Sequence, residues 1–180
     1  MEKVGEGDKK IVGALMNLRE QIKDLNNKIS DLEIMDEVTQ LYNRKELYNF
    51  LDYEVKRSQR YSNSLSVLLL RINNYTSIRE KLGEQKTNVI LAQISKLLKL
   101  NTRDIDIIGR YSDDTFMIIL PDTNSIKADI IAERMQRLIE SEIFLEDIKV
   151  TLNSGIKQYE GEFPQNIIDI ALQNLCVLKR

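Results

Sequence analysis

The sequence predicts an α/β domain with a mixed central sheet flanked by helices, preceded by a long coiled-coil helix. Three observations lead to this prediction. Apolar residues recur near the N-terminus with alternating spacings of four and three. A nearly continuous apolar run at residues 64–71 is typical of a central strand that is buried on both faces. Helical and strand-like patterns then follow one another to the C-terminus, as expected of an α/β fold.

The composition excludes several classes of protein. The 180 residues allow one ordinary domain with an appendage. A formal net charge of −2 offers no basic field to nucleic acid. No apolar run is long enough to span a membrane, and there is no secretion signal at the start. The chain has one cysteine, Cys176, and no histidine, which excludes a disulfide framework and Ser-His-Asp chemistry and argues against a zinc site. We therefore expect a cytoplasmic protein without nucleic-acid or membrane partners.

Residues 1–8 are polar with two glycines and are expected to be flexible, whereas residues 9–35 predict a coiled-coil dimerisation helix. Isoleucine dominates the a positions of the heptads and leucine the d positions, which favours a parallel two-stranded coil. The alternative is a helix that packs on its own domain, which would need a broader apolar stripe. The residues expected at the homodimer seam are Ile11, Leu15, Leu18, Ile22, Leu25, Ile29 and Leu32.

Residues 36–180 are expected to form the globular domain. A new amphipathic helix is predicted from Asp36 to about Tyr61, and the buried strand at 64–71 follows it. A polar stretch then leads to a helix at about 86–100. The predicted core residues of these two helices are Leu47, Phe50, Leu51, Ile90, Ile94, Leu97 and Leu98.

The second half of the domain begins with a hairpin pattern, in which strand-like runs at 105–111 and 116–120 flank a turn at Ser112-Asp113. A helix capped by Asn124 or Ser125 is predicted to reach about residue 142. A strand at 149–159 and a last helix from about residue 165 complete the order. The predicted core residues of these two helices are Ile130, Ile131, Met135, Leu138, Ile168, Ala171, Leu172 and Leu175.

Two segments resemble motifs of the GGDEF domain, the diguanylate cyclase fold. Residues 36–44 read Asp-Glu-Val-Thr-Gln-Leu-Tyr-Asn-Arg and are similar to the family's Asp-x-Leu-Thr-Gly-Leu-x-Asn-Arg entry, with Val38 for Leu and Gln40 for Gly. The hairpin reads Arg-Tyr-Ser-Asp-Asp-Thr-Phe where the family has Arg-Tyr-Gly-Gly-Asp-Glu-Phe. The resemblance covers residues 36–178. It implies the GGDEF fold and a family activity that condenses two GTP molecules, held by divalent metal, across a homodimer.

Most of the residues that the resemblance assigns to this chemistry are replaced, whereas Asp114 keeps the acidic third position of the signature turn. The family's metal-binding Asp at the end of the first strand falls on Arg71, and a guanidinium cannot ligate Mg²⁺. We therefore expect no catalytic residue, no bound metal and no cyclase activity, and we expect Arg71 to lie within ion-pair reach of Asp114. The degenerate positions for metal, guanine and phosphate are Arg71, Arg79, Asn88, Ser112, Asp113, Asp114 and Thr115.

A second family site is retained. Many cyclases carry an inhibitory site for cyclic di-GMP with the core Arg-x-x-Asp, ending five residues before the signature turn. Arg103 and Asp106 match it in register, and Arg134 matches a second Arg from the next helix. Arg103 offers a planar fork to guanine acceptors or phosphate, and Asp106 can accept from guanine N–H donors. The alternative is a surface ion pair that caps the strand start and binds no ligand.

The expected function is therefore that of a catalytically inactive GGDEF protein that senses cyclic di-GMP through Arg103, Asp106 and Arg134. Its coiled coil would dimerise it and carry the signal to a downstream protein partner. A dimeric scaffold that binds no nucleotide is the alternative, and residual cyclase activity ranks third.

Overall fold

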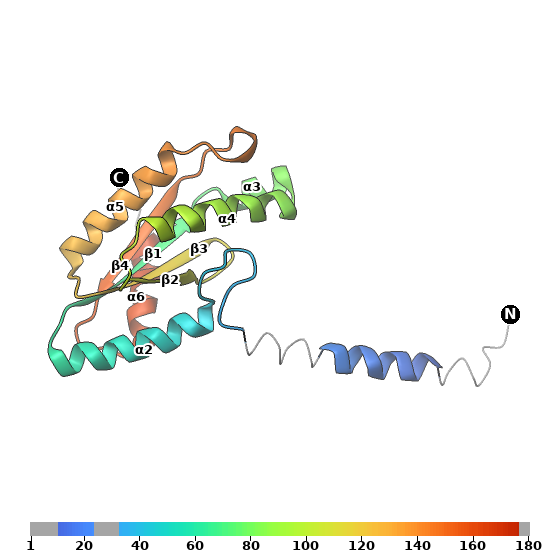
Figure 1. Cartoon of the computed structure of the whole chain (residues 1–180), viewed down its shortest axis with the longest axis horizontal. Coiled ribbons are helices and arrows are strands. Elements are labelled where there is room, and N and C mark those ends of the chain that lie inside the picture. Colours follow the sequence, from blue (N-terminus) through green and yellow to red (C-terminus); the bar gives the residue numbers. More distant parts are fainter. Residues whose placement is uncertain (1–10, 24–32, 177–180) are drawn as a thin grey trace. The chain divides into compact units, whose positions relative to one another are not determined.

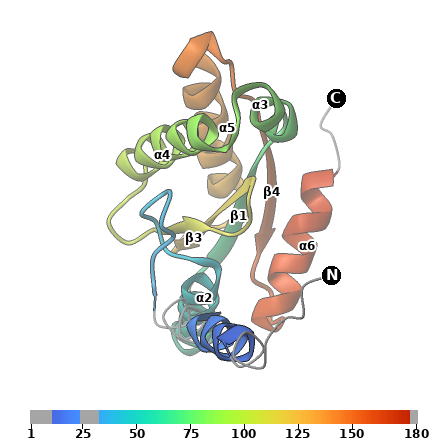
Figure 2. The same cartoon turned by 90° about the vertical axis from the view of Figure 1, so that its right-hand side faces the viewer.

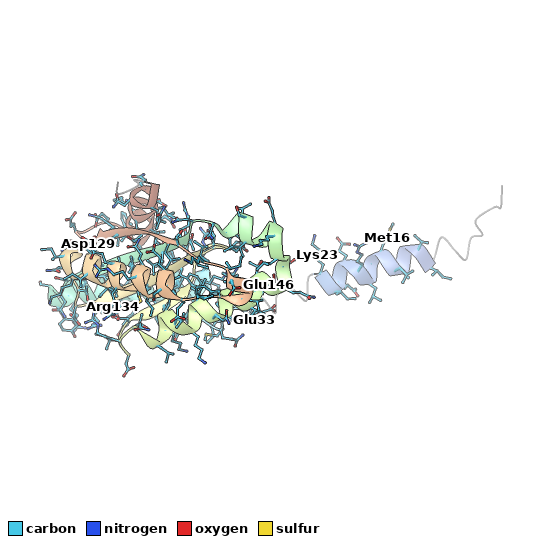
Figure 3. All side chains as sticks on the ribbon, turned by 90° about the horizontal axis from the view of Figure 1, so that it is seen from above. Met16, Lys23, Glu33, Asp129, Arg134 and Glu146 are labelled. Carbon is cyan, nitrogen blue, oxygen red and sulfur yellow. The ribbon has the colours of Figure 1, made fainter. Side chains whose placement is uncertain are left out.

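The structure, a computed structural model, describes residues 11–23 and 33–176 (Figure 1). The chain divides into two compact units, residues 1–33 and residues 34–180, and each is described by itself. In the first unit residues 11–23 are helical, and Figure 3 labels Met16 and Lys23 on this helix. Four of the predicted seam residues lie here, whereas Leu25, Ile29 and Leu32 lie outside the described residues.

The second unit is built around a four-stranded sheet in the order β2-β3-β1-β4. Its elements are α2 (Arg44–Tyr61), β1 (Leu65–Ile72), α3 (Tyr75–Leu82), α4 (Glu84–Leu100), β2 (Ile107–Arg110), β3 (Thr115–Pro121), α5 (Ser125–Ser141), the short 3₁₀ helix η1 (Leu145–Asp147), β4 (Leu152–Gln158) and α6 (Pro164–Cys176). These four strands all pair antiparallel, so the parallel pairing expected of a mixed sheet is limited to its edge. A parallel bridge between Tyr42 and Gly109 joins the segment before α2 to the edge strand β2.

Strand β1 is apolar on both faces because a hydrophobic core lies on each side of the sheet. Alternate residues of a strand point to opposite sides of the sheet. Leu68 and Leu70 therefore pack into one core with α3, α4 and α5, whereas Val67 and Leu69 pack into a second core with α2 and α6 (Figure 1 and Figure 2). The α/β fold class predicted from the sequence is confirmed.

Two predicted helices differ from the structure. The helix expected from Asp36 begins at Arg44, because residues 36–40 form a turn and the side chain of Asn43 caps the helix by accepting from the Glu46 amide. The polar stretch after β1 contains the short helix α3, which ends where Gly83 adopts a φ of 77°. In α5, Ile130 was predicted to face the core and is 63% exposed, since Ala128 and Ala132 occupy the buried stripe instead.

Gly155 on β4 is required by close packing. A Cβ at this position would lie 2.2 Å from the carbonyl oxygen of Ala171 and 2.7 Å from the amide nitrogen of Leu175. The missing side chain therefore lets α6 approach the sheet. In the described part of the chain, no helix combines the length and apolar character that crossing a membrane requires.

Candidate functional site

The turn between β2 and β3 is held by one arginine. Arg110, the last residue of β2, donates through its guanidinium to the carbonyl oxygens of Ser112 at 3.2 Å and Asp113 at 2.9 Å. The same guanidinium lies 3.3 Å from a carboxylate oxygen of Asp36, in the segment that precedes α2. Arg110 thereby ties the turn to the start of the domain.

Arg71 and Asp114 meet at the adjacent ends of β1 and β3. Arg71 Nε lies 3.8 Å from Asp114 Oδ2 and 3.4 Å from Thr115 Oγ1. Ser112 Oγ and Thr115 Oγ1 both donate to the other oxygen of Asp114, at 3.0 and 2.7 Å. The predicted approach of Arg71 to Asp114 is confirmed, and a guanidinium occupies the space beside this carboxylate.

This arrangement does not fit the divalent metal that the family uses. Mg²⁺ needs oxygen ligands, and a guanidinium offers only N–H donors. Among the described residues, no group of three or more His, Cys, Asp or Glu side chains is placed to hold a metal ion. The charge that neutralises Asp114 comes from Arg71.

Three of the other degenerate positions come together beside this turn. Arg79, Asn88 and Asp113 line one cavity of about 160 Å³, together with Tyr75 and Glu84. Asp113 adds a negative charge to this cavity where the family has a glycine. Three of the seven predicted positions therefore lie around one cavity.

Asp36 has a lowered pKa. Burial raises the pKa, but hydrogen bonds from the side chain and backbone of Thr39 and the charge and hydrogen bonds of Arg110 together lower it below the ordinary value. The Thr39 amide and hydroxyl both donate to Asp36 Oδ1, at 2.8 and 2.7 Å. The carboxylate therefore stabilises the turn at residues 36–40, where Gln40 adopts a positive φ of 54° in place of the family's glycine.

We expect Asp36→Ala to lower the free energy of unfolding by about 1–2 kcal/mol at pH 7, because it removes charge-assisted hydrogen bonds at a partly exposed site. A folded-state pKa below the unfolded value of about 3.9 gives stability that is complete above that pH and is lost as the pH falls through the folded pKa. The difference between wild type and variant should therefore shrink below about pH 4. Urea unfolding of the wild type and the variant at pH 7 and at pH 3 measures this difference in the free energy of unfolding.

The control for this prediction is Asp52→Ala, which removes an exposed pair with Lys56. It should change the stability by less than about 1 kcal/mol. An Asp36→Ala cost that is no larger than the control, or that stays constant to pH 3, would show that the carboxylate does not hold the turn.

Arg103 and Asp106 form a compact loop between α4 and β2. Asp106 Oδ2 accepts from the backbone amide of Arg103 at 2.9 Å and from its Nε at 3.4 Å. Arg103 Nη2 also donates to Thr123 Oγ1 at 2.8 Å. The side chain of Asp106 is buried, at 3% exposed, whereas that of Arg103 is 51% exposed, so the two do not form the exposed surface pair of the alternative interpretation.

A cavity of about 250 Å³ opens beside this loop. The cavity is lined by residues from the end of α4 and the following loop and from the segment before α2. These include Lys99, Arg103, Asp104, Asp106, Gln40 and Tyr42. The second carboxylate oxygen of Asp106, Oδ1, is buried and has no hydrogen-bond partner. A buried carboxylate oxygen without a donor costs free energy, so a ligand that supplies N–H groups would be favoured there.

Arg134 lies apart from this cavity wall. It projects from α5 (Figure 3) and donates to the carbonyl oxygen of Asn101 at 2.7 Å. Arg134 does not line the cavity, although its partner is two residues from Arg103. Lys99 and Gln40 do line it, and neither was predicted. No local pattern in the sequence brings residues 40 and 99 together, because only the tertiary fold does so.

Comparisons with known proteins agree on the family. The model of the family "Diguanylate cyclase, GGDEF domain" matches residues 33–180. Response regulator PleD of Caulobacter vibrioides is 31% identical over 137 residues, which cover 73% of this chain and 30% of PleD. Diguanylate cyclase DosC of Escherichia coli is 28% identical over 165 residues, covering 88% of this chain and 36% of DosC. The chain thus spans about a third of the length of these curated relatives.

Solved structures show the same fold. The active GGEEF domain of a diguanylate cyclase from Vibrio cholerae has a TM-score of 0.71 at 25% identity, covering 76% of this chain and 89% of that one. The coiled coil and GGDEF domain of DgcB from Caulobacter crescentus, solved in complex with cyclic di-GMP, has a TM-score of 0.75 at 17% identity. It covers 93% of this chain and 89% of that one.

Proposed function

Because the chain belongs to the GGDEF domain family of diguanylate cyclases, we propose that it is a catalytically inactive member that binds cyclic di-GMP through Arg103 and Asp106. The observation that carries the binding proposal is that Arg103 and Asp106 line the same cavity, and that one carboxylate oxygen of Asp106, Oδ1, is buried without a hydrogen-bond partner. Guanine presents N1–H and N2–H donors on one edge and acceptors on another. Asp106 can receive the donors, and Arg103 can donate to an acceptor or to a phosphate.

The size of the cavity limits what enters it. A volume of about 250 Å³ accommodates one purine base and leaves the rest of a cyclic dinucleotide at the surface. Arg103 is half exposed and can reach that outer part. Arg134 is assigned a peripheral contact in this proposal, because it does not line the cavity. The DgcB complex supports the class of ligand but not these contacts.

The proposed lack of cyclase activity rests on Arg71. Arg71 lies 3.8 Å from Asp114 and, by the sequence resemblance, stands where the family has a metal-binding carboxylate. Bringing a divalent cation within about 4 Å of this guanidinium would cost roughly 8 kcal/mol at an effective dielectric constant of 20, about 4 kcal/mol for each unit of metal charge. Asp113 in the neighbouring cavity would also repel a triphosphate.

Incubation of the chain with GTP and Mg²⁺ should therefore yield no cyclic di-GMP, measured by chromatography of the nucleotides. Added cyclic di-GMP should raise the melting temperature by an amount that grows with the logarithm of its concentration, whereas GTP should not. Product that disappears in an Asp114→Ala variant would establish residual cyclase activity and overturn the inactive assignment.

The alternative function, a scaffold that binds no nucleotide, is favoured by one observation. Asp106 already accepts from Arg103, so the pair has a structural role without a ligand. An unchanged melting temperature at saturating cyclic di-GMP would support the scaffold. In both proposals the chain forms a dimer through the seam predicted from the sequence at residues 9–35, and a downstream protein partner reads the dimer.

A further inference from the structure

A third cavity lies between α2, β3 and α6. Its volume is about 450 Å³, within the range of small-molecule sites in proteins. Leu47, Met117 and Ile168 form its floor and are each at most 2% exposed. Arg44, Lys45 and Tyr48 lie at the mouth, where all three are exposed. The cavity therefore combines an apolar interior with a basic entrance.

The charged side chains that line this cavity are positive, and they belong to Arg44 and Lys45. No Asp or Glu is among the described residues that line it. The Arg44 guanidinium carbon lies 4.6 Å from the centroid of the Tyr111 ring, and Nη2 donates to the Tyr111 hydroxyl at 3.2 Å. In the described part of the chain Arg44 has this aromatic partner and no carboxylate partner. Stacking holds the cation at the mouth while its remaining N–H donors can reach a ligand.

We propose that this cavity binds a small aromatic anion, a carboxylate or sulfonate, with its ring on Leu47, Met117 and Ile168 and its charge at Arg44. Burying the ring against these side chains removes apolar surface from water. The anionic group then forms charge-assisted hydrogen bonds at the entrance. A nucleotide base does not suit this interior, because its ring donors and acceptors would be left unpaired against an apolar floor.

The site is separate from the proposed cyclic di-GMP site. Leu47, Met117 and Ile168 belong to the core on the α2 and α6 face of the sheet. The cavity beside Asp106 is lined by Leu41 and Ile108, which belong to the core on the opposite face. The two sites share no lining residue, so each can be tested without the other.

Two fluorescent probes with the same rings test the proposal. 1-Anilinonaphthalene-8-sulfonate carries the anionic group, and N-phenyl-1-naphthylamine lacks it. The full chain should bind the sulfonate at one saturable site and more tightly than the neutral probe. Arg44→Met should weaken the sulfonate roughly tenfold, the loss expected for a charge-assisted contact, and should leave the neutral probe within about twofold. Ile168→Phe, which fills the cavity, should weaken both probes.

The matched control is Arg60→Met, which removes an arginine stacked on Tyr61 at the other end of the same helix. It should change neither affinity. Gln165→Trp repeats the blocking test at an exposed position of α6, in case Ile168→Phe fails to fold. Equal affinity for the two probes, several equivalent sites on the wild type, or an Arg44→Met variant that binds the sulfonate like the control would overturn the proposal. Displacement of the sulfonate by cyclic di-GMP would do so as well.

Discussion

Replacing Arg103 with alanine should weaken cyclic di-GMP binding roughly 10- to 150-fold, because it removes a charge-assisted contact of about 1.5–3 kcal/mol. The structure adds a reason for the upper part of this range. Arg103 contacts both Asp106 and Thr123, so its guanidinium is already positioned beside the cavity. Calorimetric titration of the variant measures the affinity. A variant that binds as tightly as wild type would remove Arg103 from the site.

Asp106→Asn should weaken binding nearly as much as Arg103→Ala. The new amide oxygen can still accept from the Arg103 backbone amide, as Oδ2 does now at 2.9 Å. Its NH₂ group would then take the place of the unpartnered Oδ1 and present a donor to the donors of guanine. The loop should therefore keep its fold while the ligand is lost. Asp106→Ala is a poorer test, because it also removes the acceptor for Arg103.

Two arginines on α5 serve as comparison for these variants. Arg134→Ala should weaken binding less than Arg103→Ala, because Arg134 does not line the cavity. Arg137→Ala removes an exposed arginine whose partner is Glu133 on the same helix, and it should leave the affinity unchanged. A loss as large in Arg137→Ala as in Arg103→Ala would indicate a general charge effect in place of a defined site.

Removing residues 1–33 should convert a dimer into a folded monomer. The described seam residues Ile11, Leu15, Leu18 and Ile22 are each at least 50% exposed within one chain, and in the proposed dimer a second copy would cover them. The remaining unit, residues 34–180, contains both apolar cores and keeps Ile34, whose carbonyl accepts from the Asn43 amide. Light scattering at micromolar concentration and thermal unfolding check the two parts of this prediction.

A substitution in the full chain gives a sharper version of the same test. Leu15→Lys with Ile22→Lys places charge at two a positions of the seam and should abolish the dimer. Met16→Lys, at an exposed position outside the seam, should leave the dimer intact. A wild-type chain that scatters as a monomer, or a double variant that remains dimeric, would exclude the predicted seam.

The fold could be predicted because, in most of its helices and strands, apolar residues recur at a regular spacing. The apolar run that became β1 and the stripes of α4 and α6 each follow the spacing that burial imposes. Where the spacing of apolar residues is less regular, the predicted start of a helix or its predicted core residues were wrong. The start of α2 was placed too early, because the carboxylate of Asp36 closes a turn through Thr39 that hydrophobic spacing does not report. Ile130 was wrongly assigned to the core. The buried stripe of α5 includes alanines, and an isoleucine beside them gives a stronger hydrophobic signal in the sequence.

Contacts in the candidate site could be predicted where the match to the family's motifs places two residues at adjacent strand ends. The meeting of Arg71 with Asp114 follows from their places at adjacent strand ends, as the pairing of Arg71 with Thr115 shows. The burial of Asp106 could not be predicted, because it depends on the loop turning its carboxylate onto the Arg103 amide. Neither could the cavity between α2 and α6, which arises from side chains distant in sequence.

Calorimetric titration of cyclic di-GMP into the wild-type chain tests the central claim most directly. Saturable binding with a Kd below about 100 µM, equivalent to more than roughly 5 kcal/mol of binding free energy, is the predicted result. The heat should be largely lost in the Asp106→Asn variant, provided that its melting temperature matches that of the wild type. No heat of binding at about 100 µM ligand would contradict the claim and leave a dimeric scaffold without a nucleotide site.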